Sequence, residues 1–539
     1  MNLVVKLSLV GLTCILAAVM IAGCAQNAPT QAPTETPTQT PVETKLQSKA
    51  EELIFIPSWP VKTVDPVKGG YLLLRYGIAE TLIGVGEHGE LIPCLATSWK
   101  VGEDGKTWTI TLRKDVKFHD GSEMTAPVVS EYIRMSFNKT GIFKLVPIES
   151  IIAKDDYTLE IKTKTPFAPL PAYLAYYKSV ILSPKSFDEE GNIVEVIGTG
   201  PYRLASWEPM KDAVLERFED YWGKKAETKK IILKSVPDPR SRVPILLADS
   251  ADVAQLLPPQ SIPELEKSPD IEIIKYEITR VRMIQLNCLK EPFNDKRVRF
   301  ALQYAIDRES IDKEILNGAG MPAGSLFPPL LIWANKELNP YPYNPEKAKK
   351  LLEESGWKDL DGDGVLENVN TMEEMVVKFI TYQERAELPV IAEAIQHQLK
   401  KVGIKVELEI MSYAALKEIR EKGDFDMILL GRGLFFVPDP DYNLMQDYHS
   451  SRKKAGWGAY GWNNDTVDEL LEKARETFDF DKRLEMYQKV QEIIYKESPV
   501  IVLDYYMNID AVRKNVKNYE GHINEFCYHL ERVYKVAES

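Results

Sequence analysis

The chain of 539 residues holds few of the side-chain patterns that enzymes use. Its six histidines are widely spread, and it has no Gly-x-Ser-x-Gly, His-Glu-x-x-His or Cys-x-x-Cys motif. A hydrolase triad or a zinc site therefore has no local support. Residues 84–89 match the letters of a dinucleotide-binding fingerprint, but that fingerprint follows a strand, whereas a predicted helix precedes it here. We expect a glycine-rich turn at this point, and a protein that is not an enzyme.

Residues 359–364 have the letters of the first half of a calcium-binding loop. Position twelve of such a loop would be Asn370, where calcium loops place a bidentate glutamate, and no second helix–loop pair accompanies it. Two interpretations remain for the carboxylates from Asp359 to Asp363: an Asp/Gly surface turn, or a weak calcium site.

The elements that must position any site follow from the spacing of the apolar residues. In the first half, this spacing predicts strands at 53–56, 108–112, 157–161, 213–218 and 229–235, and helices at 71–83 and 126–137. Beyond Arg280 it predicts strands at 283–287, 376–381, 405–410 and 427–430, and helices at 295–317, 345–355, 388–402, 465–478 and 482–495. Such alternation is typical of an α/β lobe. A strand at 500–503 returns the chain to the first lobe, so crossings near Arg280 and Leu503 form a predicted hinge.

The start of the chain predicts export and a lipid anchor. Lys6 precedes an apolar run at 7–22, which has the length of a signal peptide and is short for a membrane span. The run ends in Ile21-Ala22-Gly23-Cys24, and small residues directly before a cysteine are what a lipoprotein signal peptidase requires. We therefore expect residues 1–23 to be removed and Cys24 to carry the lipid. The Pro- and Thr-rich residues 24–48 are a predicted tether.

Composition limits the remaining body. Its length, with 44% hydrophobic residues overall, is too great for one simple core, so two or more lobes are expected. A formal charge of −13 without a long basic run argues against a nucleic-acid partner. Outside the cell one pair among Cys94, Cys288 and Cys527 could form a disulfide, but the sequence does not say which.

A co-linear series of short motifs covers nearly the whole mature chain. The series is Ala96-Thr97-Ser98-Trp99, Glu103-Asp104-Gly105-Lys106-Thr107-Trp108, Gly198-Thr199-Gly200-Pro201-Tyr202, Asp220-Tyr221-Trp222-Gly223, Val298-Arg299-Phe300-Ala301-Leu302, Ala305-Ile306-Asp307-Arg308 and Tyr343-Asn344-Pro345 with Gly356-Trp357. In this series the chain resembles the extracytoplasmic solute-binding proteins of peptide and nickel ABC transporters (family 5). The resemblance implies a two-lobed α/β fold of the type II periplasmic-binding-protein kind, with an extra subdomain in the first lobe, that closes over a small ligand. The expected boundaries are lobe I at 49–280, lobe II at 281–503 and a return to lobe I at 504–539.

The resemblance also locates the ligand site, and there the chain departs from the peptide binders. In those relatives a Trp and an Asp precede an acidic-Pro pair, and the Asp grips the ammonium group of the peptide. Here, counting back from Pro440, Phe436 takes the place of the Asp and Gly433 that of the Trp, while Asp439 is retained. An ammonium group buried without a counter-charge costs several kcal/mol, so ordinary peptide binding is in doubt.

The nickel binders suggest an alternative ligand. They hold metal largely through a small carboxylate-bearing chelator, using aromatic residues, arginines and one histidine, and His449 lies close to the place of that histidine. Arg75 and Arg385 are candidate cations, since an arginine fork binds both oxygens of a carboxylate. Two interpretations of His449 remain: a solvated side chain, or one donor to a metal whose other donors come from the ligand. The predicted ligand-binding set is Tyr71, Arg75, Arg385, Phe435, Phe436, Asp439, Tyr448 and His449.

The sequence thus predicts a substrate-binding lipoprotein of an ABC importer. It would act as a monomer without a cofactor, on the outer face of the cytoplasmic membrane, and deliver a peptide or a nickel-chelate-type solute to the permease subunits. Two alternatives stay open at this stage, a sensor lipoprotein with the same fold and a secreted hydrolase.

Overall fold

The computed structural model describes residues 49–139, 143–523, 525 and 527–537. The predicted signal peptide, Cys24 and the tether lie outside the described residues. Among those that are described, no helix has the length and apolar character needed to cross a membrane.

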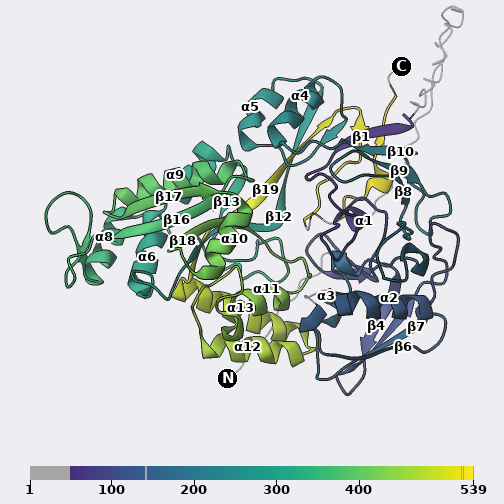
Figure 1. Cartoon of the computed structure of the whole chain (residues 1–539), viewed down its shortest axis with the longest axis horizontal. Coiled ribbons are helices and arrows are strands. Elements are labelled where there is room, and N and C mark those ends of the chain that lie inside the picture. The colour runs from purple at the N-terminus through teal and green to yellow at the C-terminus, as the bar shows by residue number, and fades with distance from the viewer. Residues whose placement is uncertain (1–48, 140–142, 524, 526, 538–539) are drawn as a thin grey trace, which may run out of the picture. The chain divides into compact units, whose positions relative to one another are not determined.

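One sheet of eleven strands runs through the described part of the chain (Figure 1). Its order is β17 (Lys405–Met411), β16 (Val376–Tyr382), β18 (Met427–Gly433), β12 (Ile271–Leu286), β19 (Val500–Arg513), β11 (Val253–Ala254), β1 (Glu52–Ile56), β10 (Lys230–Leu233), β9 (Ala213–Arg217) and β8 (Tyr202–Ser206), and β13 (Gly320–Pro322) also pairs with β19. Parallel pairs β16–β17, β16–β18 and β1–β10 stand on either side of the antiparallel pair β12–β19. This mixture of parallel strands and covering helices is the predicted α/β class.

The long strands β12 and β19 connect the two halves of the sheet. They pair antiparallel over most of their length, and their register shifts between Glu277 and Val281 and again between Arg282 and Met283. Such bulges bend a strand and redirect its side chains. The bend in β12 therefore falls at Arg280, where the sequence predicts one crossing of the hinge; the lobe boundaries themselves remain a prediction.

A second sheet in the first half is built from β4 (Ala96–Val101), β5 (Thr107–Leu112), β7 (Thr158–Thr163) and β6 (Ile148–Ala153). The helix α2 (Ala126–Lys139) packs against β6 and β7. In β5 every second residue is buried, as its alternating sequence predicts, and Trp108 anchors the layer with 5% of its surface exposed. This separate sheet matches the extra subdomain that the family resemblance implies.

Two hydrophobic cores correspond to the two halves. One joins β1, β10, α2 and the four-stranded sheet. The other joins β12, β16 and β18 with α6 (Lys296–Ala305), α8 (Pro345–Glu354), α9 (Glu387–Lys400), α12 (Asp465–Glu476) and α13 (Phe480–Glu497). Figure 1 shows α9 lying along β16 and β17, and α11 (Pro440–Asp447), α12 and α13 gathered below β18.

Most predicted elements are present, and two predicted helices are wrong. The predicted helix at 71–83 is only α1 (Leu72–Arg75), because Gly77 adopts φ +68° and the N–H groups of Ile78 and Ala79 turn back to the carbonyl of Leu73. The predicted helix at 295–317 breaks at Ile306, whose backbone is extended, and Asp307 caps the short turns that follow.

The glycine-rich turn predicted at 84–89 is confirmed. It joins β2 (Ile83–Val85) to β3 (Leu91–Pro93) in a hairpin, so no helix follows the glycines as a dinucleotide site would need. Cys94, Cys288 and Cys527 are all free thiols, so none of the pairs that the sequence left open is bonded in this structure.

Candidate functional site

Three arginines surround a carboxylate that the sequence did not indicate. Arg75 comes from α1, Arg280 from β12 and Arg385 from the turn before α9, and we call them the arginine cluster. Nη2 of Arg280 lies 3.0 Å from Oε2 of the buried Glu525. Burial alone would raise the pKa of Glu525, but Arg280, Arg75 and Arg385 outweigh burial and lower it. Glu525 is therefore an ionised carboxylate paired with Arg280, and the charges of Arg75 and Arg385 also favour its ionised form.

One donor of Arg75 has no partner. Arg75 is 5% exposed, and its Nε has no hydrogen-bond acceptor among the described residues; the Nε of Arg280 has none among them either. The guanidinium of Arg75 lies over the rings of Tyr71 and Tyr528, at 5.3 and 5.9 Å. A buried cation with unused donors is costly unless an acceptor arrives. This arrangement can bind an anion such as a carboxylate.

The chain around α1 explains how Arg75 is held. The backbone of residues 77–79 touches the loop of residues 198–200: a Cβ atom on Gly198 would lie 2.1 Å from the carbonyl oxygen of Ile78, and one on Gly200 would lie 2.3 Å from that of Gly77. Only glycine permits these approaches. The motif Gly198-Thr199-Gly200, a landmark in the sequence, thus fixes the end of the turn that carries Arg75.

Arg385 also lies near a second group of charged side chains, where β12 pairs with β19. Its Nη1 lies 3.4 Å from the hydroxyl of Tyr506, which in turn donates to Glu387 at 2.5 Å. Arg282 lies 2.6 Å from Asp504 and 3.5 Å from Glu387. Burial, opposed by Arg282, raises the pKa of Asp504 to about 6. A small cavity of about 40 Å³ lies here, lined by Trp59, Arg282, Arg385, Glu387 and Tyr506 among others.

Tyrosines from both halves of the chain meet near Tyr71. The ring of Tyr71 lies 4.7 Å from that of Tyr177. Burial raises the pKa values of Tyr413, on α10 (Tyr413–Lys422), and Tyr442, on α11, and the Tyr71 phenol adds to each rise. Tyr71 and Tyr442 also pack against the same first-half core, so α11 of the second half contributes a ring to the core that holds the start of α1.

Phe436 and Gly433 are in direct contact with each other. The Phe436 ring lies against Gly433, where an added Cβ would come within 2.4 Å of the ring. On its other side Phe436 lies 6.0 Å from the guanidinium of Arg280. Phe435 turns away into the second core, with a positive φ of 66° and 1% of its surface exposed. Phe436 thus lies beside the arginine cluster, and Phe435 has a packing role.

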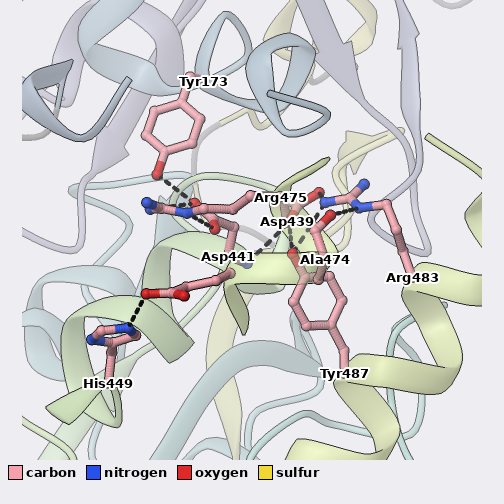
Figure 2. A network of polar contacts seen from close by, with 9 residues as sticks. Tyr173, Asp439, Asp441, His449, Ala474, Arg475, Arg483 and Tyr487 are labelled. Atoms are coloured by element: carbon pink, nitrogen blue, oxygen red, sulfur yellow. Dashed lines mark hydrogen bonds and ion pairs between the residues drawn. The ribbon is translucent and has the colours of Figure 1, made fainter. Parts of the chain in front are cut away.

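Asp439 belongs to a buried network, shown in Figure 2. Its carboxylate accepts from Arg483 at 2.7 Å, from Tyr487 at 3.2 Å and from the Asp441 N–H at 2.9 Å, which makes it the N-cap of α11. Both oxygens are occupied, so Asp439 holds the loop and does not offer a free carboxylate to a ligand.

Tyr448 and His449 lie at the far end of α11. Tyr448 is buried in the second core with its ring edge toward Trp462. The Nδ1 of His449 lies 2.8 Å from the Ser451 hydroxyl, and its Nε2 lies 3.4 Å from a carboxylate oxygen of Glu472. These contacts give His449 local partners, and its role in binding stays a prediction.

Sequence reasoning missed Arg280 and Glu525 as members of the candidate site. Arg280 marked only a boundary in the sequence, and no pattern around Glu525 distinguishes it from other surface acids. These residues become recognisable only when β12 and the C-terminal segment lie side by side.

The acidic loop keeps both of its interpretations. The exposed Asp359, Asp361 and Asp363 are the one group of possible metal-binding side chains within the described residues, and their oxygens lie within 4.8 Å of one another. Their carboxylates also accept from the backbone N–H groups of Gly362, Asp363 and Gly364, as in an ordinary Asp/Gly turn.

Comparison with known proteins decides the family. The model of the bacterial extracellular solute-binding proteins, family 5, matches residues 90–455. The chain belongs to this family. The oligopeptide-binding protein AppA of Bacillus subtilis is 30% identical over 458 residues, covering 81% of this chain and 82% of AppA. The dipeptide-binding protein of Escherichia coli is 27% identical over 463 residues, covering 80% of this chain and 84% of that protein.

Solved structures agree on the fold. NikA from Brucella suis, in complex with Fe(III)-EDTA, superposes with a TM-score of 0.82 at 24% identity, covering 90% of this chain and 99% of NikA. The two-lobed α/β fold predicted from the sequence is therefore confirmed, as is the membership of a family of extracytoplasmic binding proteins and not of enzymes.

Proposed function

We propose that this protein is the substrate-binding lipoprotein of an ABC importer and that it binds a compact anionic solute, with a small metal chelate favoured over a free peptide. The observation that carries the choice is the arginine cluster, which has one ion-paired carboxylate and two buried Nε groups that find no acceptor in the described part of the chain. A carboxylate of the ligand would satisfy those donors. Relatives described as peptide-binding and nickel-transporting support the two ligand classes.

Phe436 weighs against a free peptide. It fills the position at which peptide binders carry the gripping Asp, and its neighbour is the Arg280 guanidinium, which repels an ammonium group. Main-chain contacts and ordered water can still bind a peptide, so peptides remain the second candidate class.

The mechanism of capture is closure of the two lobes. Arg75 lies on the first half and Arg385 on the second, so a ligand that contacts both is satisfied only in the closed form. The permease would then recognise the closed shape. Cys24 would hold the protein, as a monomer, on the outer face of the cytoplasmic membrane, and a Cys24→Ser variant should appear in the medium.

Native mass spectrometry of protein purified without added ligand, combined with metal analysis, tests the proposal. A small organic acid together with a stoichiometric metal, both lost on acidification, is the expected result. A ladder of metal-free peptides would instead favour the second ligand class.

A further inference from the structure

The C-terminal segment places Glu525 between two members of the arginine cluster. On one side the N–H of Thr279, next to Arg280, donates to the carbonyl of Ile523 at 2.9 Å. On the other side the N–H of Tyr528 donates to the carbonyl of Arg75 at 3.2 Å. These backbone bonds tie the segment to β12 and to α1 and leave Glu525 between them.

The strand β19 links Glu525 to Arg385, the third member of the arginine cluster. Asn508 donates from its side-chain amide to Oε1 of Glu525 at 3.5 Å. Tyr506, two residues earlier and on the same face of the strand, lies 3.4 Å from Arg385. Glu525 also has a positive φ of 56°, an unfavourable backbone conformation for a residue with a Cβ. The surrounding contacts hold it there in spite of that cost.

Glu525 lowers the positive charge of the arginine cluster. The three members of the cluster carry three positive charges. Glu525 is ion-paired to the cluster through Arg280, at 3.0 Å, and the charges of Arg75 and Arg385 also act on it. Glu525 therefore offsets one of these positive charges, and without it the cluster would be more positive by one.

We propose that Glu525 is a specificity-determining residue that tunes the net charge of the accepted ligand, because it offsets one positive charge of the arginine cluster. The inference rests on the proposed function of this site. It follows that Glu525 favours the less negative of two otherwise similar anionic ligands.

Two chelates of the same shape and different charge provide the test. The EDTA complexes of Co(III) and Ni(II) are both six-coordinate, with net charges of one and two negative units. Their dissociation constants are measured by calorimetry for the full chain and for Glu525→Gln. We expect the ratio of the two constants to shift toward the Ni(II) complex by about tenfold in the variant, since one charge at close range in a partly buried site is worth at least that much.

Two control variants separate charge from structure. Glu525→Asp keeps the charge and should keep the wild-type ratio. Glu531→Gln removes a carboxylate of the same segment whose partner is His529, 3.2 Å away, and should leave the ratio unchanged. A Glu525→Gln ratio within twofold of wild type would overturn the inference.

A second measurement covers the case in which neither chelate binds, which would count against the proposed function. Sulfate then serves as the probe, and the rise in Tm with sulfate concentration is compared between variants. A larger rise for Glu525→Gln than for Glu531→Gln supports the role of Glu525, and equal rises overturn it.

Discussion

The hydroxyl of Tyr173 donates to the Asp441 carboxylate at 2.9 Å, although 268 residues separate them in the chain. Asp441 also accepts from Arg475, at 2.6 and 3.2 Å, and the carbonyl of Arg475 accepts from the N–H of Ala168 at 2.7 Å. Figure 2 shows Tyr173 reaching toward Asp441 and Arg475 from another part of the fold. First-half and second-half residues are therefore bonded to each other at a point other than the arginine cluster.

Tyr173→Phe should weaken closure. The change removes one hydrogen bond to a charged acceptor, worth about 1.5–3 kcal/mol, and leaves the packing intact. We expect a larger radius of gyration by small-angle scattering and an affinity for ligand about tenfold lower.

Tyr202→Phe is the matched control. Its buried hydroxyl donates to carbonyls of Thr228 and Leu530 and does not reach α11. This variant should lose stability while keeping the wild-type radius of gyration. If Tyr173→Phe behaves in the same way, the bond to Asp441 has no part in closure.

Gly433 and Phe436 should be energetically coupled. Gly433→Ala places a Cβ within 2.4 Å of the Phe436 ring, so it should lower the free energy of unfolding. In the double variant with Phe436→Ala the ring is gone, and Gly433→Ala should cost much less. Urea unfolding of the four proteins should give an interaction energy of about 1–3 kcal/mol, and additive costs would mean that the ring moves aside freely.

Arg75→Met should lower the affinity for ligand without lowering the stability of the protein. The guanidinium is buried and its Nε has no acceptor among the residues that the structure describes, so replacing it with an apolar side chain of similar length should not lower Tm. Affinity for an anionic ligand should fall about tenfold or more, because a charged hydrogen bond is lost. Arg113→Met, at a guanidinium that stacks on Trp222 at 4.1 Å, is the control and should keep full affinity. Equal affinity of Arg75→Met and wild type would remove Arg75 from the site.

Asp439→Ala should lower the stability of the protein and leave its affinity for ligand nearly unchanged. The change leaves the Arg483 cation buried without its partner, which costs about 3–5 kcal/mol. Thermal unfolding should show a large fall in Tm. Below that temperature, calorimetry should give a near-normal affinity, whereas a selective loss of affinity would restore Asp439 as a ligand contact.

The amino-acid sequence predicts the helices and strands better than the residues at which they end. Alternation identified β5 and helical spacing identified α9, because each buries one face along its length. The predicted helix at 71–83 failed since apolar spacing continues past Gly77, whose left-handed backbone ends α1. The end of α1 depends on packing against the loop at 198–200, and no pattern in the sequence around Gly77 indicates that contact.

The candidate site could be predicted only in part. Arg75 and Arg385 were chosen for their chemistry, and both lie in the arginine cluster with Arg280. Glu525 was not foreseen, because its partners come from three distant segments. The landmark Asp220-Tyr221-Trp222-Gly223 has a similar explanation: Tyr221 and Trp222 donate to the buried Glu80, at 2.7 and 2.9 Å, from more than a hundred residues away.

His119 should make the protein sensitive to acid. Its ring joins two residues of the 198–200 loop: Nδ1 accepts from the N–H of Gly198 at 3.3 Å, and Nε2 lies 3.0 Å from the carbonyl of Gly200. Only the neutral ring can accept at Nδ1, since protonation would set two N–H groups against each other. Burial lowers the pKa of His119 to about 4, although the bond to Gly200 opposes the change.

The direction of the pH effect follows from the lowered pKa. Above about pH 6.5 the ring is neutral in both states, so its contribution to stability is fully present. As the pH falls from about 6.5 to 4, the unfolded chain takes up a proton that the folded protein refuses, and roughly 3 kcal/mol of stability is lost. Urea unfolding at pH 7.5 and 4.5 measures this loss, which should be smaller in His119→Gln because an amide keeps a donor and an acceptor without titrating. An equal loss in the wild type and the variant would assign the acid sensitivity to other groups.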